Sequence, residues 1–329
     1  MAPQLAPVAL ATIQQPVKTE LEAVFDRLGL IIESDFQMIA DVNAHLLRIR
    51  GKLFRPTIVL LSAKATTDLE ERHVPLAAVV ELIHLATLIH DDSVDHSVLR
   101  RGQPTVNSLF SHQIAVIMGD YLYSRAIVEL VKLNDLDPLR VMSRVTNEMT
   151  VGEMREIEAH DVLDFTAAQY DRLIDAKTAS LMSGAAEVGA VGAPPAQRAA
   201  LKRYGRALGM AFQIADDVLD YMGAEELIGK PTALDLREHK ITLPLIAALP
   251  EMNAPERATV VELMRNPAPS DEHIQAVMEA VARRGGIEAA LARALEFANA
   301  AHAELEHLPP SKARDALGDA IAYVVDRQS

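Results

Sequence analysis

The sequence predicts an all-α protein folded as a single large helical bundle. Apolar residues recur with helical spacing along almost all of the 329 residues, and no stretch alternates convincingly with the period of two that marks a half-buried strand. Aromatic residues make up only 4% of the chain and Trp is absent, while Ala, Leu and Val dominate, a composition that favours helices over strands. We therefore expect helices and no sheet.

Local breakers divide the chain into its expected helices. Gly102 and Pro104 end one helix, and the segments 189–195 and 266–270 are loops rich in Gly, Pro and Ala. No linker is long enough to separate two domains, so residues 1–329 are expected to form one domain. The helices are expected near 17–33, 35–49, 52–67, 75–95, 107–118, 119–134, 137–160, 166–190, 196–221, 239–249, 255–265, 271–284, 286–307 and 311–327.

Two of these segments are apolar on all sides. Residues 75–95 and residues 207–222 lack the polar stripe of a surface helix, so both are expected to lie in the centre of the bundle. Glu81, His84 and His90 interrupt the first segment, which leaves it short of the roughly 18 uncharged apolar residues of a membrane span. We therefore expect no stable membrane insertion.

The overall composition limits the classes of function. The chain has no cysteine, so it has no disulfide or thiolate site, and a reducing, cytoplasmic location fits. A net charge of −14 argues against a general nucleic-acid binder. Pro3, Pro7 and Pro16 break the N-terminal segment, which lacks a basic region, so residues 1–16 are expected to form a loose arm and not a signal peptide.

An acidic cluster stands at the end of the apolar segment 75–95. Asp91 and Asp95 are four residues apart and therefore share one face of a helix, with Asp92 beside them. Ionised carboxylates that leave a buried helix together require a compensating partner. Oxygen ligands without cysteine favour a hard cation such as Mg²⁺. Taken alone, the cluster could equally be a solvated helix end.

A second cluster repeats the same Asp-Asp-x-x-Asp spacing. Asp216, Asp217 and Asp220 again follow a long apolar helix, and two accidental copies are much less probable than one. If the two helices face each other, the six acids form one site for several metal ions. Because Mg²⁺ usually takes its remaining ligands from water and substrate phosphates, the clusters indicate a phosphorylated ligand.

Basic residues supply the complementary charge for such a ligand. Adjacent Arg100 and Arg101 can address two different phosphate groups, each with the fork geometry of a guanidinium. The segment GKLFRP lacks the Gly-rich loop and the Ser or Thr of a P-loop, which argues against an ordinary nucleotide enzyme. The candidate phosphate ligands are Lys52, Arg55, Arg100, Arg101, Lys177, Lys230 and Lys240.

From about residue 45 to its end, the chain resembles the trans-type polyprenyl diphosphate synthases. These enzymes condense an allylic diphosphate with isopentenyl diphosphate, and they share an all-α bundle around a central apolar cavity. The motifs occur in order and are specific as a set. They are GKLFRP, HLATLIHDDSVDHSVLRRGQPTVN, GDYLYSRA, AKTASLMSGAAEVGA, FQIADDVLD, GKPTALDLREHKITLP and RRGGIEAAL.

The resemblance implies a role for each matching position. The principal Mg²⁺ ligands are Asp91, Asp95 and Asp216, with Asp92, Asp217 and Asp220 in supporting roles. Contacts to the allylic diphosphate are Arg100, Lys177, Lys230 and Lys240. The isopentenyl diphosphate site comprises Lys52, Arg55, His84 and Arg101. Thr178 and Gln213 line the cavity in which the allylic cation develops, and the family resemblance also leads us to expect a homodimer.

Two positions depart from the family pattern, and two others bear on product length. Leu53 stands where an arginine is common, and His239 stands where a glycine is common.

Ala86 and Thr87 lie about one helical turn below Asp91, where a bulky aromatic residue would close the product tunnel early. Small residues there predict a product longer than geranylgeranyl diphosphate, a precursor of a quinone side chain. Met118, Leu122 and Met142 are candidates for the tunnel floor.

Other functions remain open at this point. A geranylgeranyl diphosphate synthase would share every motif, and a non-catalytic subunit of a heteromeric synthase would be expected to have lost one aspartate cluster. A terpene cyclase has no need of GKLFRP and Arg101. A Ca²⁺ sensor would carry its acids in a Gly-containing loop and not on helices.

Overall fold

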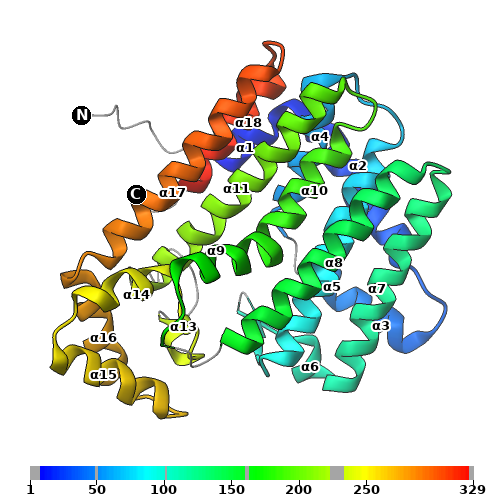
Figure 1. The fold of residues 1–329 in the computed structure, drawn as a ribbon. Helices are drawn as coiled ribbons and strands as arrows, with labels where there is room; N and C mark the ends of the chain where they lie inside the picture. Colours follow the sequence, from blue (N-terminus) through cyan, green and yellow to red (C-terminus); the bar gives the residue numbers. More distant parts are fainter. Residues whose placement is uncertain (1–7, 49–50, 101, 160–162, 223–232, 326–329) are drawn as a thin grey trace.

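The computed structural model describes residues 8–48, 51–100, 102–159, 163–222 and 233–325, and it is almost entirely helical. Long helices run side by side, and the central ones are α5 (His73–Val94), α10 (Ser180–Gly189) and α11 (Pro195–Tyr221) (Figure 1). Every residue of α10 is buried, and most of α5 is buried as well. The predicted all-α bundle is therefore confirmed, with both aspartate clusters on central helices.

Helix α5 is long and apolar enough to cross a membrane, but its surroundings give it a different role. Of its apolar window, 61% is buried inside the protein. A core helix of a bundle that is covered on all sides has this apolar composition without any membrane.

The N-terminal segment is more ordered than the sequence predicted. Residues 10–16 were expected to belong to a loose arm, but they form α1 (Leu10–Gln14) and the start of a 3-10 turn at Gln15–Val17. Ile13 and Val17 are fully buried, which explains why this segment is anchored. The chain continues through α2 (Lys18–Ile32), α3 (Gln37–Arg48) and α4 (Phe54–Thr66).

A short hairpin corrects the expectation that the protein has no sheet. Strands β1 (Leu99–Arg100) and β2 (Gln103–Pro104) pair antiparallel, with Gly102 in a left-handed conformation at the turn. Two-residue strands are too short to show a period-two pattern, so they could not be predicted from the sequence. The hairpin directly follows the first aspartate cluster and carries Arg100.

Helix α7 (His112–Lys132) runs without interruption through residues 118 and 119, where the sequence analysis expected a break. Position 119 requires a glycine because the ring of His90 packs against it, and a Cβ atom there would lie 2.2 Å from Nε2 of His90. The glycine therefore permits a close contact between α5 and α7 and does not end a helix. The preceding α6 (Val106–Leu109) is a single turn.

The expected helix 166–190 forms in three joined pieces. Helix α9 (Ala167–Ile174) begins with a capping box between Thr166 and Gln169, and α10 follows it. Between them, Asp175–Ala179 forms a π-helical turn. Such turns often occur at functional sites, and this one carries Lys177 and Thr178. Helix α8 (Leu136–Ala159) packs against it.

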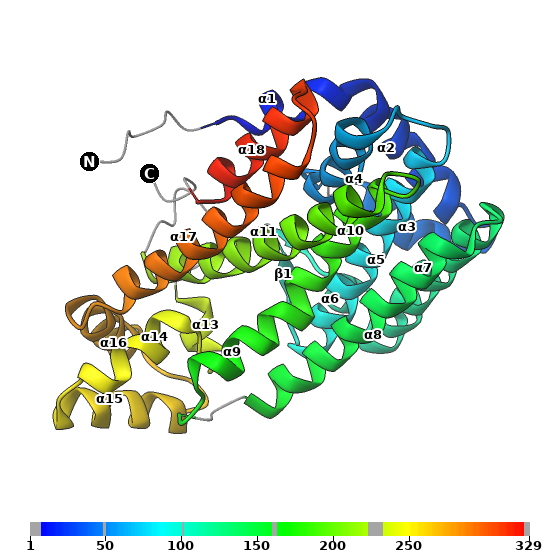
Figure 2. The ribbon, with the colours of Figure 1, turned by 45° about the horizontal axis from the view of Figure 1, so that its top comes forward.

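The C-terminal part adds a group of short helices at one end of the bundle and two longer ones along its side (Figure 2). Ser270 and Ser311 cap two of these helices at their N-termini by accepting hydrogen bonds from the backbone N–H groups of His273 and Arg314. The remaining helices are α13 (Leu234–Arg237), α14 (Leu243–Ala248), α15 (Ala254–Arg265), α16 (Asp271–Arg283), α17 (Gly286–Glu304) and α18 (Lys312–Val325), with 3-10 turns at Leu249–Glu251 and Leu305–His307.

Candidate active site

The first aspartate cluster lies at the C-terminal end of α5. Asp91 and Asp92 belong to the last turn of this helix, and Asp95 follows as its cap. Asp92 is buried and binds the guanidinium of Arg100 through both oxygens, with Nη2 2.7 Å from Oδ1 and Nε 2.9 Å from Oδ2. Asp92 thus fixes the hairpin to the helix and positions Arg100, while Asp91 and Asp95 are free of this fork.

Two predicted lysines face the other acids of the first cluster. Nζ of Lys177 lies 3.9 Å from Oδ2 of Asp91, and Nζ of Lys240 lies 3.2 Å from Oδ2 of Asp95. Lys177 reaches this point from the π-helical turn, whereas Lys240 comes from the loop after α13. The fold therefore brings together residues that are about 85 and 145 positions apart, as the sequence analysis expected.

Glu153 and Glu156 of α8 complete this charged cluster, and the sequence analysis missed them. Lys177 forms ion pairs with both, at 2.8 Å to Glu153 and closer still to Glu156. Glu156 also lies 3.7 Å from Lys240. The only sequence signal was their spacing of three residues, which places both on one helix face, and that spacing is common on surface helices.

The combined effect of burial and the neighbouring charges raises the pKa values of Asp91, Lys177 and Lys240. Burial raises the pKa of Asp91 to about 7, with Glu153, Glu156 and Asp95 adding to the shift and Lys177 opposing it. Burial opposes the charged form of Lys177, yet the carboxylates of Asp91, Glu156 and Glu153 raise its pKa above the ordinary value. The cluster is thus an acid-rich site in which additional positive charge would be stabilising.

The second aspartate cluster has the same spacing but different surroundings. Asp217 is buried and accepts hydrogen bonds from the Tyr170 hydroxyl and from Nε2 of Gln213, the latter at 2.7 Å. Burial raises the pKa of Asp217 to about 7, and these two hydrogen bonds oppose the shift.

The two outer acids of this cluster also differ from each other. Asp220 accepts the backbone N–H groups of Leu234 and Asp235, each at 2.9 Å, and so holds the first turn of α13. Asp216, in contrast, is exposed.

Thr178 and Gln213 form a hydrogen-bonded pair between the π-helical turn and α11. The hydroxyl of Thr178 donates to Oε1 of Gln213 at 2.8 Å, while the amide nitrogen of the same glutamine donates to Asp217. The pair therefore connects the segment that carries Lys177 with the second cluster. The predicted role of both residues in lining the cavity of the allylic cation stays a prediction.

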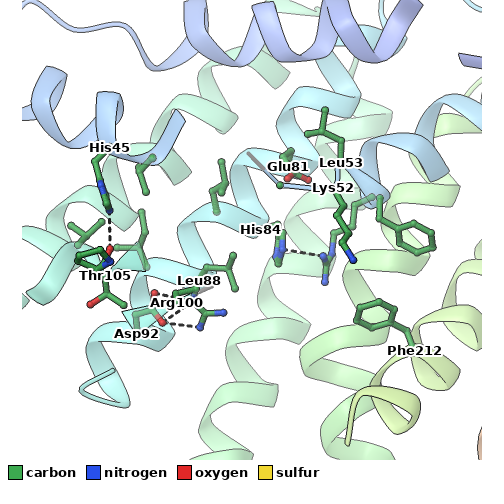
Figure 3. Close-up of a pocket in the computed structure, with 18 of the residues that line it drawn as sticks. His45, Lys52, Leu53, Glu81, His84, Leu88, Asp92, Arg100, Thr105 and Phe212 are labelled. Carbon is green, nitrogen blue, oxygen red and sulfur yellow. Dashed lines mark hydrogen bonds and ion pairs between the residues drawn. The ribbon is translucent and has the colours of Figure 1, made fainter. Parts of the chain in front are cut away.

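A separate pocket lined by basic residues opens beside the first aspartate cluster (Figure 3). Nη1 of Arg55 lies 3.0 Å from Nε2 of His84, and both residues line the pocket with Lys52 and Arg100. Arg100 thus stands between the first cluster and this pocket. The deeper wall is apolar and includes Leu85, Leu88, Ile89 and Val106. Of the remaining predicted phosphate ligands, Arg101 and Lys230 lie outside the described residues.

The two departures from the family pattern share an unusual backbone conformation. Leu53 and His239 both have positive φ angles, 49° and 55°. A left-handed conformation is uncommon for residues other than glycine, although histidine adopts it more readily than leucine. Nε2 of His239 lies 3.0 Å from the carbonyl oxygen of Asn266, a contact that secures the side chain where a glycine would have none.

Ala86 and Thr87 lie below the first cluster in the apolar core. Ala86 is 2% exposed, and the Thr87 hydroxyl donates to the carbonyl of His84 at 2.8 Å. Met118, Leu122 and Met142, the candidates for a tunnel floor, belong to the same buried cluster of side chains. The residues beneath Asp91 are therefore small or flexible and apolar, and no aromatic side chain stands at position 86 or 87.

The donor set of the two aspartate clusters fits a hard divalent cation. The candidate ligands are carboxylate oxygens, and Asp91 and Asp95 lie one turn apart on a partly buried helix end where positive charge would be stabilising. Among the residues that the structure describes, no three acids or histidines already converge as a closed metal site. The ammonium groups of Lys177 and Lys240 lie beside these acids instead.

Comparisons with known proteins agree with this geometry. Residues 36–281 match the family model described as polyprenyl synthetase. The chain belongs to the polyprenyl synthetase family. Its members are prenyltransferases, so the resemblance drawn from the ordered motifs is confirmed, and this chain is a prenyltransferase as well.

Individual relatives of this family are similar over most of their length. An octaprenyl diphosphate synthase of Escherichia coli is 38% identical over 87% of this chain and 89% of its own. A crystal structure of a decaprenyl diphosphate synthase from Rhodobacter capsulatus superposes with a TM-score of 0.92 at 36% identity, covering 97% of this chain and 99% of that one. A polyprenyl synthase from Caulobacter crescentus, complexed with calcium and isoprenyl diphosphate, gives a TM-score of 0.94 at 32% identity, with coverages of 99% and 100%.

Proposed function

We propose that this prenyltransferase condenses an allylic prenyl diphosphate with isopentenyl diphosphate, head to tail, to make a long trans-polyprenyl diphosphate. The observation that carries the proposal is the pairing of two adjacent sites. An acid-rich cluster with Lys177 and Lys240 lies next to a separate basic pocket with Lys52, Arg55 and His84. The first site can hold a diphosphate through bound metal ions and the two lysines, and the second can hold one through its cations, as a reaction between two diphosphates requires.

The allylic diphosphate is assigned to the cluster between the two aspartate motifs. Arg100, Lys177 and Lys240 are its described cationic ligands, with Lys230 as a further one. The raised pKa values of Lys177 and Lys240 keep both amines protonated at neutral pH, so each can donate hydrogen bonds to phosphate oxygens. Isopentenyl diphosphate is assigned to Lys52, Arg55, His84 and Arg101.

Mg²⁺ is the proposed metal, held by Asp91, Asp95 and Asp216. It would supply the positive charge that stabilises a departing diphosphate. Asp92 contributes by holding Arg100, and Asp217 and Asp220 contribute by fixing Gln213 and the start of α13. The Caulobacter crescentus neighbour was complexed with calcium, another hard divalent cation, which supports the class of metal.

The chemistry follows from where the charges lie. The protonated lysines and Arg100 stabilise the negative charge that develops on the allylic diphosphate as its C–O bond breaks. The oxygens of Thr178 and Gln213 face the allylic carbocation, and the double bond of isopentenyl diphosphate attacks it to form the new C–C bond. A proton then leaves the resulting cation, and the departed diphosphate accepts it. The apolar wall beyond His84 keeps water away from the cation.

Product length is assigned to the small residues under the first cluster. Ala86 and Thr87 leave room for a chain to grow past Asp91, and the decaprenyl and octaprenyl synthases among the relatives support a long product. Incubation of the purified chain with farnesyl diphosphate, isopentenyl diphosphate and Mg²⁺, followed by chromatography, tests this assignment. Products longer than C20 are expected, whereas C20 alone would indicate a geranylgeranyl diphosphate synthase. No product from the chain alone would indicate a subunit that needs a partner.

A substitution tests which residue opens the way for the product. Ala86→Phe places a ring one turn below Asp91 and is expected to shift the product distribution to shorter chains. The matched control is Ala292→Phe at an exposed position of α17, which should leave product length unchanged. An unchanged distribution for Ala86→Phe would remove this residue from the length-determining set.

A homodimer and a cytoplasmic location complete the proposal. Helix α7 exposes a run of large apolar side chains, Val116, Ile117, Ile127, Val128 and Val131. Several large exposed apolar side chains on one helix are typical of a surface covered by another subunit. Sedimentation equilibrium is expected to give twice the chain mass of 35.8 kDa, and replacing Ile117 and Val128 with Asp should give monomers.

A further inference from the structure

We propose that the two ends of the chain form a clasp that positions Lys52 for the second diphosphate. Gln14 of α1 donates from Nε2 to the backbone carbonyl of Lys52 at 2.9 Å. At the other end of the same residue, Nζ of Lys52 lies 3.4 Å from the hydroxyl of Tyr323 in α18. Both Gln14 and Tyr323 lie outside the residues 36–281 that match the family model. The inference rests on the proposed role of Lys52 as an isopentenyl diphosphate ligand.

The backbone next to Lys52 needs such support. Leu53 has a φ angle of 49°, a conformation that a branched side chain rarely adopts, and strained residues persist where their surroundings hold them. Thr57 donates its hydroxyl hydrogen to the carbonyl of Leu53 at 2.7 Å, and Gln14 Nε2 lies 3.1 Å from the same hydroxyl oxygen. The Gln14 amide is therefore bonded on both sides of the strained turn, to Lys52 and to Thr57.

The aromatic ring of Tyr323 supports the same turn from the opposite side. Phe54 stands between Tyr323 and Phe212, with ring centroids 5.7 Å and 6.2 Å away. Phe212 directly precedes Gln213, which belongs to the allylic part of the site. The contacts of Tyr323 thus connect α18 to the turn that starts α4 and, through Phe54, to α11. Phe212 and Lys52 face the same pocket (Figure 3).

The ends of the chain are in place to act together. Helices α1 and α18 pack against each other, and α18 also packs along α4, which begins directly after the Lys52 turn. Holding a long lysine side chain in one orientation removes part of the conformational entropy that binding would otherwise cost. Because the clasp touches Lys52 and not the residues near Asp91, it should affect binding of one substrate and not the other.

The first test separates the two substrates kinetically. Tyr323→Phe keeps the ring and removes only the hydroxyl, and Gln14→Met keeps the length of the side chain and removes its amide. Tyr323→Phe is expected to raise the KM for isopentenyl diphosphate about 3-fold, the effect of losing one modest hydrogen bond, and Gln14→Met, which loses two, at least as much. The KM for the allylic diphosphate and kcat should stay as in the wild type for both, and the melting temperature should stay unchanged for Tyr323→Phe. Matched controls are Tyr121→Phe, whose hydroxyl donates to Ile32, and Gln15→Met at an exposed neighbouring position.

A double-mutant cycle shows whether Tyr323 acts through Lys52. In a Lys52→Met background, Tyr323→Phe should have no further effect on the KM for isopentenyl diphosphate, because its partner is already gone. Effects that multiply would overturn the clasp. Equal increases in both KM values, or a lowered melting temperature with the same loss for both substrates, would also overturn it, because these results mark a general structural role.

A binding measurement keeps this inference separate from the proposed reaction. Isopentenyl diphosphate is titrated into the wild type and the two clasp variants by calorimetry, without Mg²⁺ and without an allylic primer. Weaker binding by both variants would support the clasp even if the wild type formed no polyprenyl product, a result that would refute only the proposed reaction. Equal binding by all three proteins would overturn the clasp whatever the outcome of the turnover assay.

Discussion

The two aspartate clusters have the same spacing, but the protein uses them differently. In each, the second acid is buried and bound by another side chain: Asp92 by Arg100, and Asp217 by Tyr170 and Gln213. In the first cluster both outer acids, Asp91 and Asp95, lie beside ammonium groups, those of Lys177 and Lys240. In the second cluster the outer acid Asp220 accepts two backbone N–H groups of α13, and the other outer acid, Asp216, is exposed.

This difference shows that identical motifs need not carry identical chemistry. The outer acids of the first cluster face cations that a ligand could displace, so both are available to a metal ion. In the second cluster, only the exposed Asp216 is available in the same sense. The partners of each carboxylate are consistent with the proposed division into two metal ligands from the first cluster and one from the second, whereas the spacing alone would have predicted a symmetrical site.

The largest effect is expected from removing an outer acid of the first cluster. Asp91→Asn keeps the size of the side chain and removes its charge, so kcat should fall by about 10³-fold, equivalent to several kcal/mol of charge stabilisation. The loss should be accompanied by a higher Mg²⁺ requirement, measured by titrating Mg²⁺ in a steady-state assay. Asp120→Asn, at an exposed position on α7, is the control. A kcat within tenfold of the wild type would mean that Asp91 is not a principal ligand.

An intermediate effect is expected at the buried acid of the second cluster. Asp217→Asn leaves one acceptor oxygen for two donors, so either the Tyr170 hydroxyl or Nε2 of Gln213 faces the new amide nitrogen, which should lower the free energy of unfolding by about 2 kcal/mol. The Mg²⁺ requirement should change much less than in Asp91→Asn. Chemical denaturation and the same Mg²⁺ titration measure the two effects. If Asp217→Asn raised the Mg²⁺ requirement as strongly as Asp91→Asn, the two clusters would not differ as described.

The smallest effect is expected at Asp220. Asp220→Ala removes the acceptor for the N–H groups of Leu234 and Asp235, and losing such a helix cap costs about 1 kcal/mol. Because Lys240 follows α13 and donates its own N–H to the Asp235 carbonyl at 2.7 Å, the KM for the allylic diphosphate should rise a little. Asp220→Asn should recover most of the stability, since its amide oxygen still accepts one bond. Full recovery of stability with a large loss of kcat would indicate a ligand role.

The sequence was sufficient to predict the site residues whose arrangement depends only on their spacing along one helix. Asp91 and Asp95 share a face because they are four residues apart, and the aspartates of α11 follow the same rule. The partners of these acids depend on the tertiary fold. Glu156 meets Lys177 and Lys240 only because α8 lies beside the π-helical turn, and no local pattern distinguishes it from the other glutamates of α8.

The errors in the fold have equally specific causes. Gly119 resembled a helix break, but it is small because the His90 ring packs against it from α5. Residues 10–16 resembled part of a loose arm because Pro3, Pro7 and Pro16 break the N-terminal segment, although Ile13 is fully buried against the rest of the protein. In both cases a contact between distant segments decided the local structure. Helix propensity depends only on residues that are neighbours in the sequence, so it cannot predict such a contact.

The π-helical turn at Asp175–Ala179 determines in which directions the side chains before it and within it point, relative to the two aspartate clusters. A π turn contains one residue more than the α-helical turn that it replaces, and each residue advances a helix by about 100°. Tyr170, before the turn, reaches Asp217 of the second cluster, whereas Lys177, within it, reaches Asp91 of the first. Deleting a single residue here would restore a regular helix and rotate Tyr170 and Lys177 relative to each other, so that both could no longer reach their aspartates. The one additional residue of the π turn therefore allows one continuous segment to contact both clusters.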